Sequence, residues 1–299
     1  MVRMKHTLAF VLAFLVVGVA ALPKAASGQI QYAQSISGDH FVYHPTGSTE
    51  VTGVLVIAHG TRNNDEIAKE TAERFLRRWT IFADENKLLL IAPVFDDQRF
   101  GNRGGGYGGY RGLFGREVAA DQFVIDIVRH HQTVHGLKTG EFLLYGHSAG
   151  AQFAGRFSVK HPELISFAVL SAPGRYAYPT LDAKWPYGAG GLRRSIKWPD
   201  GTTKTVSVQG DLGHFAAAAG RLFVLVGAKD TSAQPERPGH KGKNRVEFMI
   251  SWLGDMNKNA ALHGYQGLVR GYVAPDIGHD SKALTPYAQQ VFKEYLSLR

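Results

Sequence analysis

Short apolar runs with few charged residues recur along the chain from Val51 onward. Continuous runs of this kind are typical of strands buried on both faces of a parallel sheet. The predicted strands are residues 54–58, 88–91, 142–145, 167–170, 222–226 and 267–273.

Longer segments between these runs carry apolar residues at close to helical spacing. The predicted helices are residues 64–85, 116–135, 149–160, 246–262 and 287–298. Strands that alternate with helices in this way predict an α/β fold, with a mostly parallel sheet and helices on both faces. No repeat or linker interrupts the pattern, so a single domain is expected.

Two stretches break the alternation. Residues 101–110 are too rich in glycine for regular structure, and residues 174–220 form a long insertion between two predicted strands. Within the insertion, residues 196–198 and 203–208 flank Pro199-Asp200-Gly201, a turn signal that predicts a β-hairpin. Long loops in a compact domain usually serve a function.

Composition narrows the chemistry. The 299 residues are 44% hydrophobic and 20% charged, which excludes a disordered chain, a collagen or a coiled coil. The chain contains no cysteine, so disulfides, a thiol nucleophile, zinc–thiolate sites and iron–sulfur clusters are excluded. No group of His, Asp and Glu has metal-ligand spacing, so no metal is expected.

The first 28 residues resemble a secretory signal peptide. Arg3 and Lys5 precede an apolar run at residues 8–22, and Ala26 and Gly28 are small residues at the expected cleavage site. The alternative is an uncleaved membrane anchor, but a run of about 15 residues is shorter than a spanning helix needs. Cleavage would leave one domain at residues 29–299, in a secreted or periplasmic protein.

The charge gives no sign of a nucleic-acid partner. Cleavage after Gly28 would remove three basic residues and no acidic one, lowering the formal charge from +9 to +6. The densest basic stretch, residues 237–245, is broken by Pro, Gly and His. Nucleic-acid binding needs a basic stripe and a reading motif, and the sequence has neither. No stable membrane insertion is expected after cleavage either.

The pentapeptide at residues 146–150 matches the pattern G-x-S-x-G. It directly follows one predicted strand and directly precedes a predicted helix, which is the setting of a nucleophile elbow. A serine on such a strained turn needs small neighbours, and Gly146 and Gly150 meet that need. Ser148 is therefore the candidate nucleophile; the alternative is a glycine-rich strand–helix turn without chemistry.

A serine nucleophile requires a base and a group that orients the base. His279 lies between the last predicted strand and the last helix, at the sheet edge where Ser148 also lies. His214 and His240 are weaker alternatives in loops. Asp230 directly follows a strand and is the candidate acid, although it could instead cap a helix.

Acyl transfer also requires donors for the developing oxyanion. The backbone amide of Ala149, directly after the nucleophile, is one candidate. Thr61 is the other, because His59-Gly60-Thr61 follows the first strong strand. His59 itself is expected to brace this loop.

These residues make the chain resemble the α/β-hydrolase superfamily over about residues 50–299. Within it, the layout is most similar to secreted esterases and polyhydroxyalkanoate-depolymerase-like serine hydrolases. The resemblance implies an eight-stranded, mostly parallel sheet and an acyl-enzyme mechanism without a cofactor. Two antiparallel strands should then lie within residues 29–50, one of them near residues 41–43.

Aromatic residues are the candidate substrate contacts. Tyr107 and Tyr110 in the glycine-rich stretch could line a substrate groove, and Trp185 belongs to a group of aromatic residues in the insertion. That group either forms a cap over Ser148 or fills a small core of its own.

The function that the sequence predicts is hydrolysis of carboxylic esters, small or polymeric, by a secreted serine hydrolase. Alternatives are a serine peptidase of the same fold and a binding protein on an inactive hydrolase scaffold.

Overall fold

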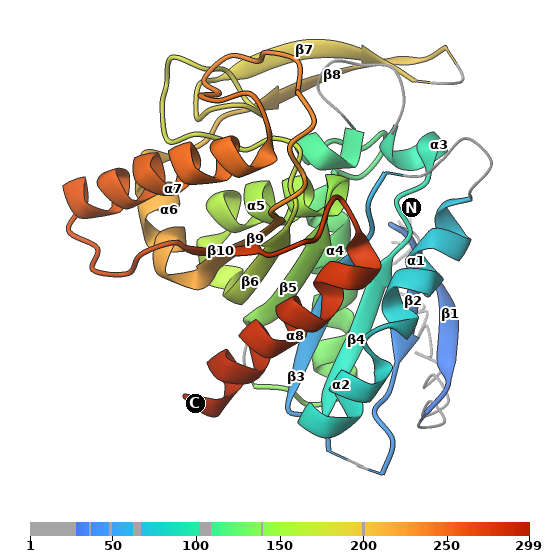
Figure 1. Cartoon of the computed structure of the whole chain (residues 1–299). Helices are drawn as coiled ribbons and strands as arrows, with labels where there is room; N and C mark the ends of the chain where they lie inside the picture. The colour runs from blue at the N-terminus through green and yellow to red at the C-terminus, as the bar shows by residue number, and fades with distance from the viewer. Residues whose placement is uncertain are drawn as a thin grey trace, which may run out of the picture.

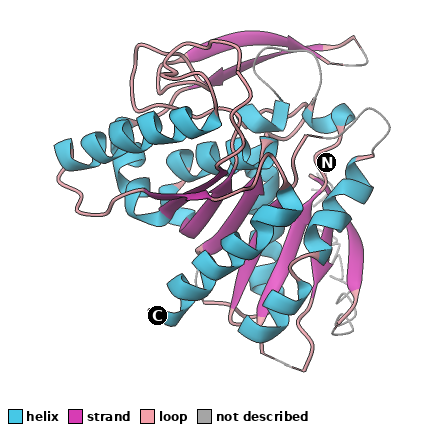
Figure 2. Cartoon of the chain, in the orientation of Figure 1, coloured by secondary structure: helices cyan, strands magenta, loops and turns pink. Residues whose placement is uncertain are grey.

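A central sheet lies between two layers of helices (Figures 1 and 2). The computed structural model describes residues 28–35, 37–47, 50–61, 67–101, 109–138, 140–198 and 201–299. The expected signal peptide therefore lies outside the described residues except for Gly28. In the described part of the chain, no helix is both long and apolar enough to cross a bilayer.

Eight strands form the central sheet in the order β1-β2-β4-β3-β5-β6-β9-β10. The first two strands are antiparallel to their neighbours and the remaining pairs are parallel, as the resemblance implied. The strands are β1 Ile30–Ser35, β2 Gly38–Tyr43, β3 Gly53–Ala58, β4 Leu88–Pro93, β5 Phe142–His147, β6 Ile165–Ser171, β9 Leu222–Gly227 and β10 Arg270–Ala274.

Strand β3 shows why the predicted strands are continuous apolar runs. Val54, Val56 and Ala58 pack into the core on one face of the sheet, while Leu55 and Ile57 pack into the core on the other. Successive side chains of a strand point to opposite faces, so a sheet covered on both faces requires apolar residues at every position.

The helices divide between the two faces of the sheet. Residues of α1, α2 and α8 pack in one core, and residues of α4, α5, α6 and α7 pack in the other. The helices are α1 Ala68–Arg77, α2 Thr80–Asn86, α3 Asp97–Phe100, α4 Ala120–Val134, α5 Ala149–Lys160, α6 Leu212–Ala218, α7 Arg245–Leu262 and α8 Ser281–Ser297, with short 3₁₀ turns η1 Gly109–Gly112, η2 Pro162–Leu164 and η3 Ala219–Arg221.

Two helix predictions need correction. The predicted helix 64–85 is two helices, α1 and α2, separated by Arg78 and Trp79. Trp79 is fully buried against Tyr145 and Phe292, and the chain turns where this large side chain enters the core. The last helix begins at Ser281 rather than at residue 287, with Pro286 in its interior.

The insertion contains the predicted hairpin. Strands β7 Leu192–Lys197 and β8 Thr203–Val208 pair antiparallel, and α6 follows them. Its aromatic side chains are mostly buried, which favours the alternative in which they fill a core; the buried ones are Tyr176, Tyr178, Trp185 and Trp198. The hairpin forms the upper rim of the molecule in Figure 1.

Candidate active site

The turn between β5 and α5 has the geometry of a nucleophile elbow. Ser148 has φ 55° and ψ −110°, and its N–H donates to the Ser171 carbonyl at 2.8 Å. A Cβ atom at Gly146 would lie 2.2 Å from the Gly150 carbonyl oxygen, and one at Gly150 would lie 2.1 Å from the Ala58 carbonyl oxygen. Both glycines are therefore required for the chain to pass, as the motif predicted.

Three side chains from separate loops meet at this turn. His279 Nε2 lies 3.0 Å from Ser148 Oγ, and His279 Nδ1 lies 2.7 Å from Asp230 Oδ2. Ser148 follows β5, Asp230 lies beyond β9, and His279 lies between β10 and α8. Because these strands are parallel, their carboxyl ends share one edge of the sheet, and residues 49 and 131 positions apart come into contact.

Asp230 is held as an anion although its side chain is only 2% exposed. Burial alone would raise the pKa of this carboxyl group. The hydrogen bond and charge of His279, together with Arg245, outweigh burial and lower the pKa. Arg245 Nη1 donates to Asp230 Oδ1 at 2.7 Å, so each carboxylate oxygen has its own partner.

His147 lies within the elbow beside His279. The two ring centroids are 5.0 Å apart, and His147 Nδ1 lies 3.1 Å from Ser171 Oγ. Burial, followed by the charges of His279 and Arg78, lowers the pKa of His147 to about 3. His147 is therefore neutral at neutral pH and adds no charge beside His279. Sequence reasoning did not single it out, although it is part of the pentapeptide.

The expected oxyanion donors lie on either side of the nucleophile. Ala149 is the first residue of α5, where backbone N–H groups have no partner within the helix. On the other side, a Cβ atom at Gly60 would lie 3.5 Å from Ser148 Cβ, so the loop after β3 passes directly beside the serine. Thr61 is the next residue of that loop and is exposed.

His59 holds this loop in place. It is fully buried, and the Phe95 N–H donates to its Nε2 at 3.2 Å. Nδ1 therefore carries the ring proton and donates to the Gly60 carbonyl at 2.9 Å. This arrangement agrees with the bracing role that the sequence suggested.

Two of the expected substrate contacts are corrected by their burial. Tyr110 is fully buried, donates to the His59 carbonyl at 3.1 Å and stacks on Phe95. Trp185 is fully buried and donates to the Gly112 carbonyl at 2.8 Å. Both side chains support the loops around the site and are not accessible to a substrate. Tyr107 lies outside the described residues.

The alternative histidines are engaged elsewhere. His240 Nε2 accepts the Tyr176 N–H at 3.1 Å, and burial lowers the pKa of His240 to about 4. His214 lies on α6 beside the Lys160 carbonyl. Within the described residues, no group of three or more His, Asp or Glu side chains has the geometry of a metal site.

No protein-family model and no curated protein matches the sequence. Solved structures match over most of its length. A poly(3-hydroxybutyrate) depolymerase, LpqC, from Bordetella parapertussis is 22% identical, with a TM-score of 0.66 over 85% of this chain and 83% of its own. Poly(aspartic acid) hydrolase-1 from Sphingomonas sp. KT-1 has the same identity and TM-score over 88% and 97% of the two chains.

A fluorophosphonate-binding serine hydrolase of Staphylococcus aureus is 15% identical, with a TM-score of 0.52 over 90% of this chain and 96% of its own. The protein has the α/β-hydrolase fold. The strand order, the elbow after β5 and the convergence of Ser148, Asp230 and His279 at one edge of the α/β-hydrolase sheet all fit this assignment.

Proposed function

We propose that the protein is a serine hydrolase that cleaves carboxylic ester bonds through an acyl-enzyme on Ser148. The observation that carries this proposal is the pair of contacts from Ser148 Oγ to His279 Nε2 and from His279 Nδ1 to Asp230. A nucleophile, a base and an acid that orients the base are what acyl transfer requires. The similarity to a poly(3-hydroxybutyrate) depolymerase and to a fluorophosphonate-binding serine hydrolase supports the same chemistry.

In the first half-reaction, Ser148 Oγ attacks the carbonyl carbon while His279 Nε2 takes the hydroxyl proton. The carbonyl oxygen becomes an oxyanion, which the amides of Ala149 and Thr61 stabilise in this proposal. Asp230 holds the imidazolium through Nδ1. His279 then donates the Nε2 proton to the departing alkoxide oxygen, so the C–O bond breaks and an alcohol leaves.

In the second half-reaction, His279 Nε2 takes a proton from water while the water oxygen attacks the acyl carbon of Ser148. The same amides stabilise the second oxyanion. The ester bond to Ser148 Oγ then breaks, Oγ recovers the proton from Nε2, and the carboxylic acid leaves. Each proton taken by His279 is returned within the cycle.

Amide hydrolysis is a second candidate. It uses the same three side chains, and one of the similar structures is a hydrolase of poly(aspartic acid), which is a polyamide. Either substrate class could be a small molecule or a polymer, since the same chemistry acts on both. A matched pair of substrates separates the two bond types.

The deciding experiment is hydrolysis of nitrophenyl esters from acetate to palmitate, beside the matching nitroanilides, by wild type and Ser148→Ala. Ester turnover that depends on Ser148 supports the proposal, and the preferred chain length measures the acyl pocket. Turnover of anilides alone favours amide hydrolysis. No turnover, and no labelling of Ser148 by a fluorophosphonate, favours a binding protein on an inactive scaffold.

We further propose that residues 1–28 are a signal peptide and that residues 29–299 form the exported hydrolase domain, with residues 174–220 as a cap-like insertion. The basic start, the apolar run and the small residues before position 29 support export. Mass spectrometry of protein recovered outside the cytoplasm should find Gln29 at its amino terminus. Intact protein in the membrane fraction would instead favour an anchor.

A further inference from the structure

Arg245 is the one charged side chain that contacts the Asp230 carboxylate on the side away from His279 in the described structure. We propose that Arg245 is a positioning residue, which holds the carboxylate of Asp230 in the orientation that His279 requires. This inference rests on the proposed function.

The two carboxylate oxygens are divided between two partners. Oδ2 faces His279 Nδ1 at 2.7 Å, and Oδ1 accepts from Arg245 Nη1 at 2.7 Å. With both oxygens engaged, the carboxylate cannot rotate about its last bond without breaking a charge-assisted hydrogen bond. The side chains of Asp230 and Arg245 are only 2% and 15% exposed, so water competes poorly for either group.

The position of Arg245 in its helix indicates a role outside that helix. It is the first residue of α7, directly after the capping residue Asn244, whose side chain accepts the Glu247 N–H. Helix amino termini favour acidic side chains, because the helix dipole is positive there. A half-buried arginine at this position costs helix stability, and the ion pair with Asp230 offsets that cost.

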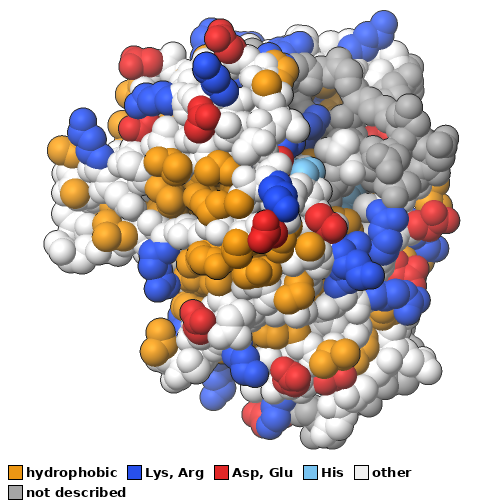
Figure 3. Space-filling view, viewed as in Figure 1, with side chains coloured by type: hydrophobic (Ala, Val, Ile, Leu, Met, Phe, Trp, Pro, Cys, Tyr) orange, Lys and Arg blue, Asp and Glu red, His pale blue; other side chains and the backbone are white. Residues whose placement is uncertain are grey.

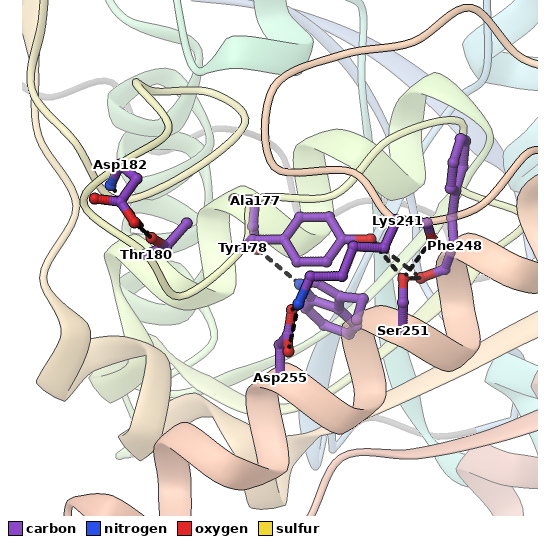
Figure 4. Close-up of polar contacts among 9 residues, drawn as sticks. Ala177, Tyr178, Thr180, Asp182, Lys241, Phe248, Ser251 and Asp255 are labelled. Atoms are coloured by element: carbon purple, nitrogen blue, oxygen red, sulfur yellow. Dashed lines mark hydrogen bonds and ion pairs between the residues drawn. The ribbon is translucent and has the colours of Figure 1, made fainter.

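Helix α7 is in turn fixed to the insertion (Figure 4). Tyr178 OH lies 2.9 Å from Ser251 Oγ, and Trp252 Nε1 donates to the Ala177 carbonyl at 2.7 Å. Ser251 Oγ also donates to the carbonyl of Lys241, in the loop before α7. Arg245 therefore stands on an element whose first turns are anchored, and it transmits that anchorage to Asp230.

Two consequences follow for the reaction. Loss of Arg245 frees the carboxylate to turn, so fewer molecules hold His279 in line with Ser148. Loss of the guanidinium also removes the cation that shares the negative charge of Asp230 with His279. The carboxylate then attracts a positive charge on the imidazole more strongly, which should appear in the acid limb of kcat/KM.

The other titratable or charged side chains around Asp230 and His279 stay the same in every variant below. They are neutral His147 beside the His279 ring, Arg78 near His147, the exposed ion pair of Lys229 and Asp276, and Asp280 at the start of α8.

The test compares Arg245→Gln, Arg245→Lys and the control Lys241→Gln in Ser148-dependent ester hydrolysis. Lys241, in the loop before α7, is exposed and forms an ion pair with Asp255 of α7, whereas the described partners of Asp230 are His279 and Arg245. For Arg245→Gln we expect kcat to fall about 10- to 100-fold with KM within about twofold. The acid limb of kcat/KM should move to higher pH. Arg245→Lys should return the acid limb and most of kcat, and the control should match wild type.

A second comparison removes both partners. If Arg245 acts through Asp230, Arg245→Gln should cause no further loss of kcat in an Asp230→Asn background. This double variant also leaves no unpaired buried charge, so it stays informative if Arg245→Gln alone does not fold.

Three results would overturn the inference: wild-type kinetics in Arg245→Gln, an additive loss in the double variant, or a lowered Tm with an unmoved acid limb. The first and third show a residue that is dispensable or merely structural. Hydrolysis that persists in Ser148→Ala is a different failure, because it overturns the proposed function whatever Arg245 does.

Discussion

Ser148 has a left-handed backbone conformation that residues with a side chain rarely adopt. The surrounding chain enforces it: the Ser148 N–H is bonded to the Ser171 carbonyl, and Gly146 and Gly150 leave no room for another path. Strain of this kind persists only where the rest of the fold determines it. The proposed nucleophile is thus fixed by packing before any substrate binds.

Replacement of Ser148 by alanine removes the hydroxyl and leaves this backbone unchanged. We expect Ser148→Ala to lower kcat by about 10⁴- to 10⁶-fold, the range seen when one member of such a triad is removed. Because Ala has the same backbone preferences as Ser at this site, the Tm should stay within a few degrees. Steady-state kinetics and thermal melting check both parts, and near wild-type turnover would contradict the assignment.

A substitution at Gly150 tests separately whether the elbow requires a glycine for steric reasons. In Gly150→Ala the new Cβ would meet backbone oxygen of Ala58 at 2.1 Å, so the elbow must shift. We expect a loss of about 3 kcal/mol or more in the free energy of unfolding. The matched control is Gly254→Ala in α7, where a Cβ meets nothing within 4 Å and should stabilise by up to about 1 kcal/mol. Equal stabilities of the two variants in denaturant melts would contradict the steric account.

At the scale of single residues, the sequence predicts where the candidate site residues lie better than it predicts which side chains they contact. Ser148, Asp230 and His279 each follow a recognisable strand, so topology alone brings them to one edge. No comparable sequence signal identifies Arg245, because its contact with Asp230 depends on how α7 packs against the rest of the fold. Tyr110 and Trp185 were predicted to contact the substrate because they are aromatic. Large aromatic side chains are, however, more often buried in a protein core than exposed to a ligand.

Among the elements, β2 and α4 meet through a pair of histidines. His40 Nε2 and His131 Nε2 are 2.9 Å apart, and both side chains are buried. Burial, followed by the charges of neighbouring histidines, lowers the pKa of His40 to about 4 and that of His131 to about 3. Both rings are neutral at neutral pH, and one donates its proton to the other.

This pair should make the fold sensitive to acid. Below pH 6.5 the histidines of the unfolded chain take up protons, whereas the folded pair does not until about pH 4. The stability from a lowered histidine pKa is therefore present above pH 6.5 and lost as the pH falls toward 4. We expect each of the two histidines to lower the free energy of unfolding by about 1–2 kcal/mol at pH 5 relative to pH 7.

The measurement is Tm at pH 7 and pH 5 for wild type, His131→Gln and the control His214→Gln, which alters an exposed histidine. His131→Gln should show a smaller fall in Tm between the two pH values, and the control should match wild type. An identical fall in Tm for all three proteins would mean that groups other than His131 cause the sensitivity to acid.

The hairpin of β7 and β8 is the element best suited to test the cap. Arg194 pairs with Val206, so residues 195–205 can be replaced by Asn-Gly to give a shorter hairpin in the same register. We expect the shortened protein to hydrolyse nitrophenyl acetate with kcat/KM within about tenfold of wild type. Its preference among longer acyl chains should change, because the removed segment reaches Gly101 through Trp198. An unchanged preference would show that the hairpin only supports the fold.

Element ends were harder to predict than elements. The sequence analysis placed the start of the last helix at residue 287, six residues after its observed start. In the structure the side chain of Asp280 accepts from the Lys282 and Ala283 N–H groups, and this cap starts α8 at Ser281.

At the scale of the molecule, the order of apolar runs predicted a mostly parallel sheet between helices, and the resemblance to α/β-hydrolases supplied the count of eight strands, which the structure confirms. The order of apolar runs could not predict the surface. Hydrophobic side chains gather over α7, β10 and α8 (Figure 3), where Ile250 and Tyr272 are 61% and 45% exposed. Such exposure depends on which elements lie at the edge of the sheet, and the sequence pattern does not encode that.

Strand β10 is that edge, with β9 as its only neighbour in the described sheet. His279 lies five residues beyond it. His279, the proposed general base, is thus tethered to the edge of the sheet, where local opening requires the least free energy, whereas Ser148 follows the interior strand β5. On gradual addition of denaturant, ester hydrolysis should vanish before the tryptophan fluorescence changes. Inactivation would then be a reversible local unfolding of the β10 edge of the sheet, and activity would recover as soon as β10 pairs with β9 again.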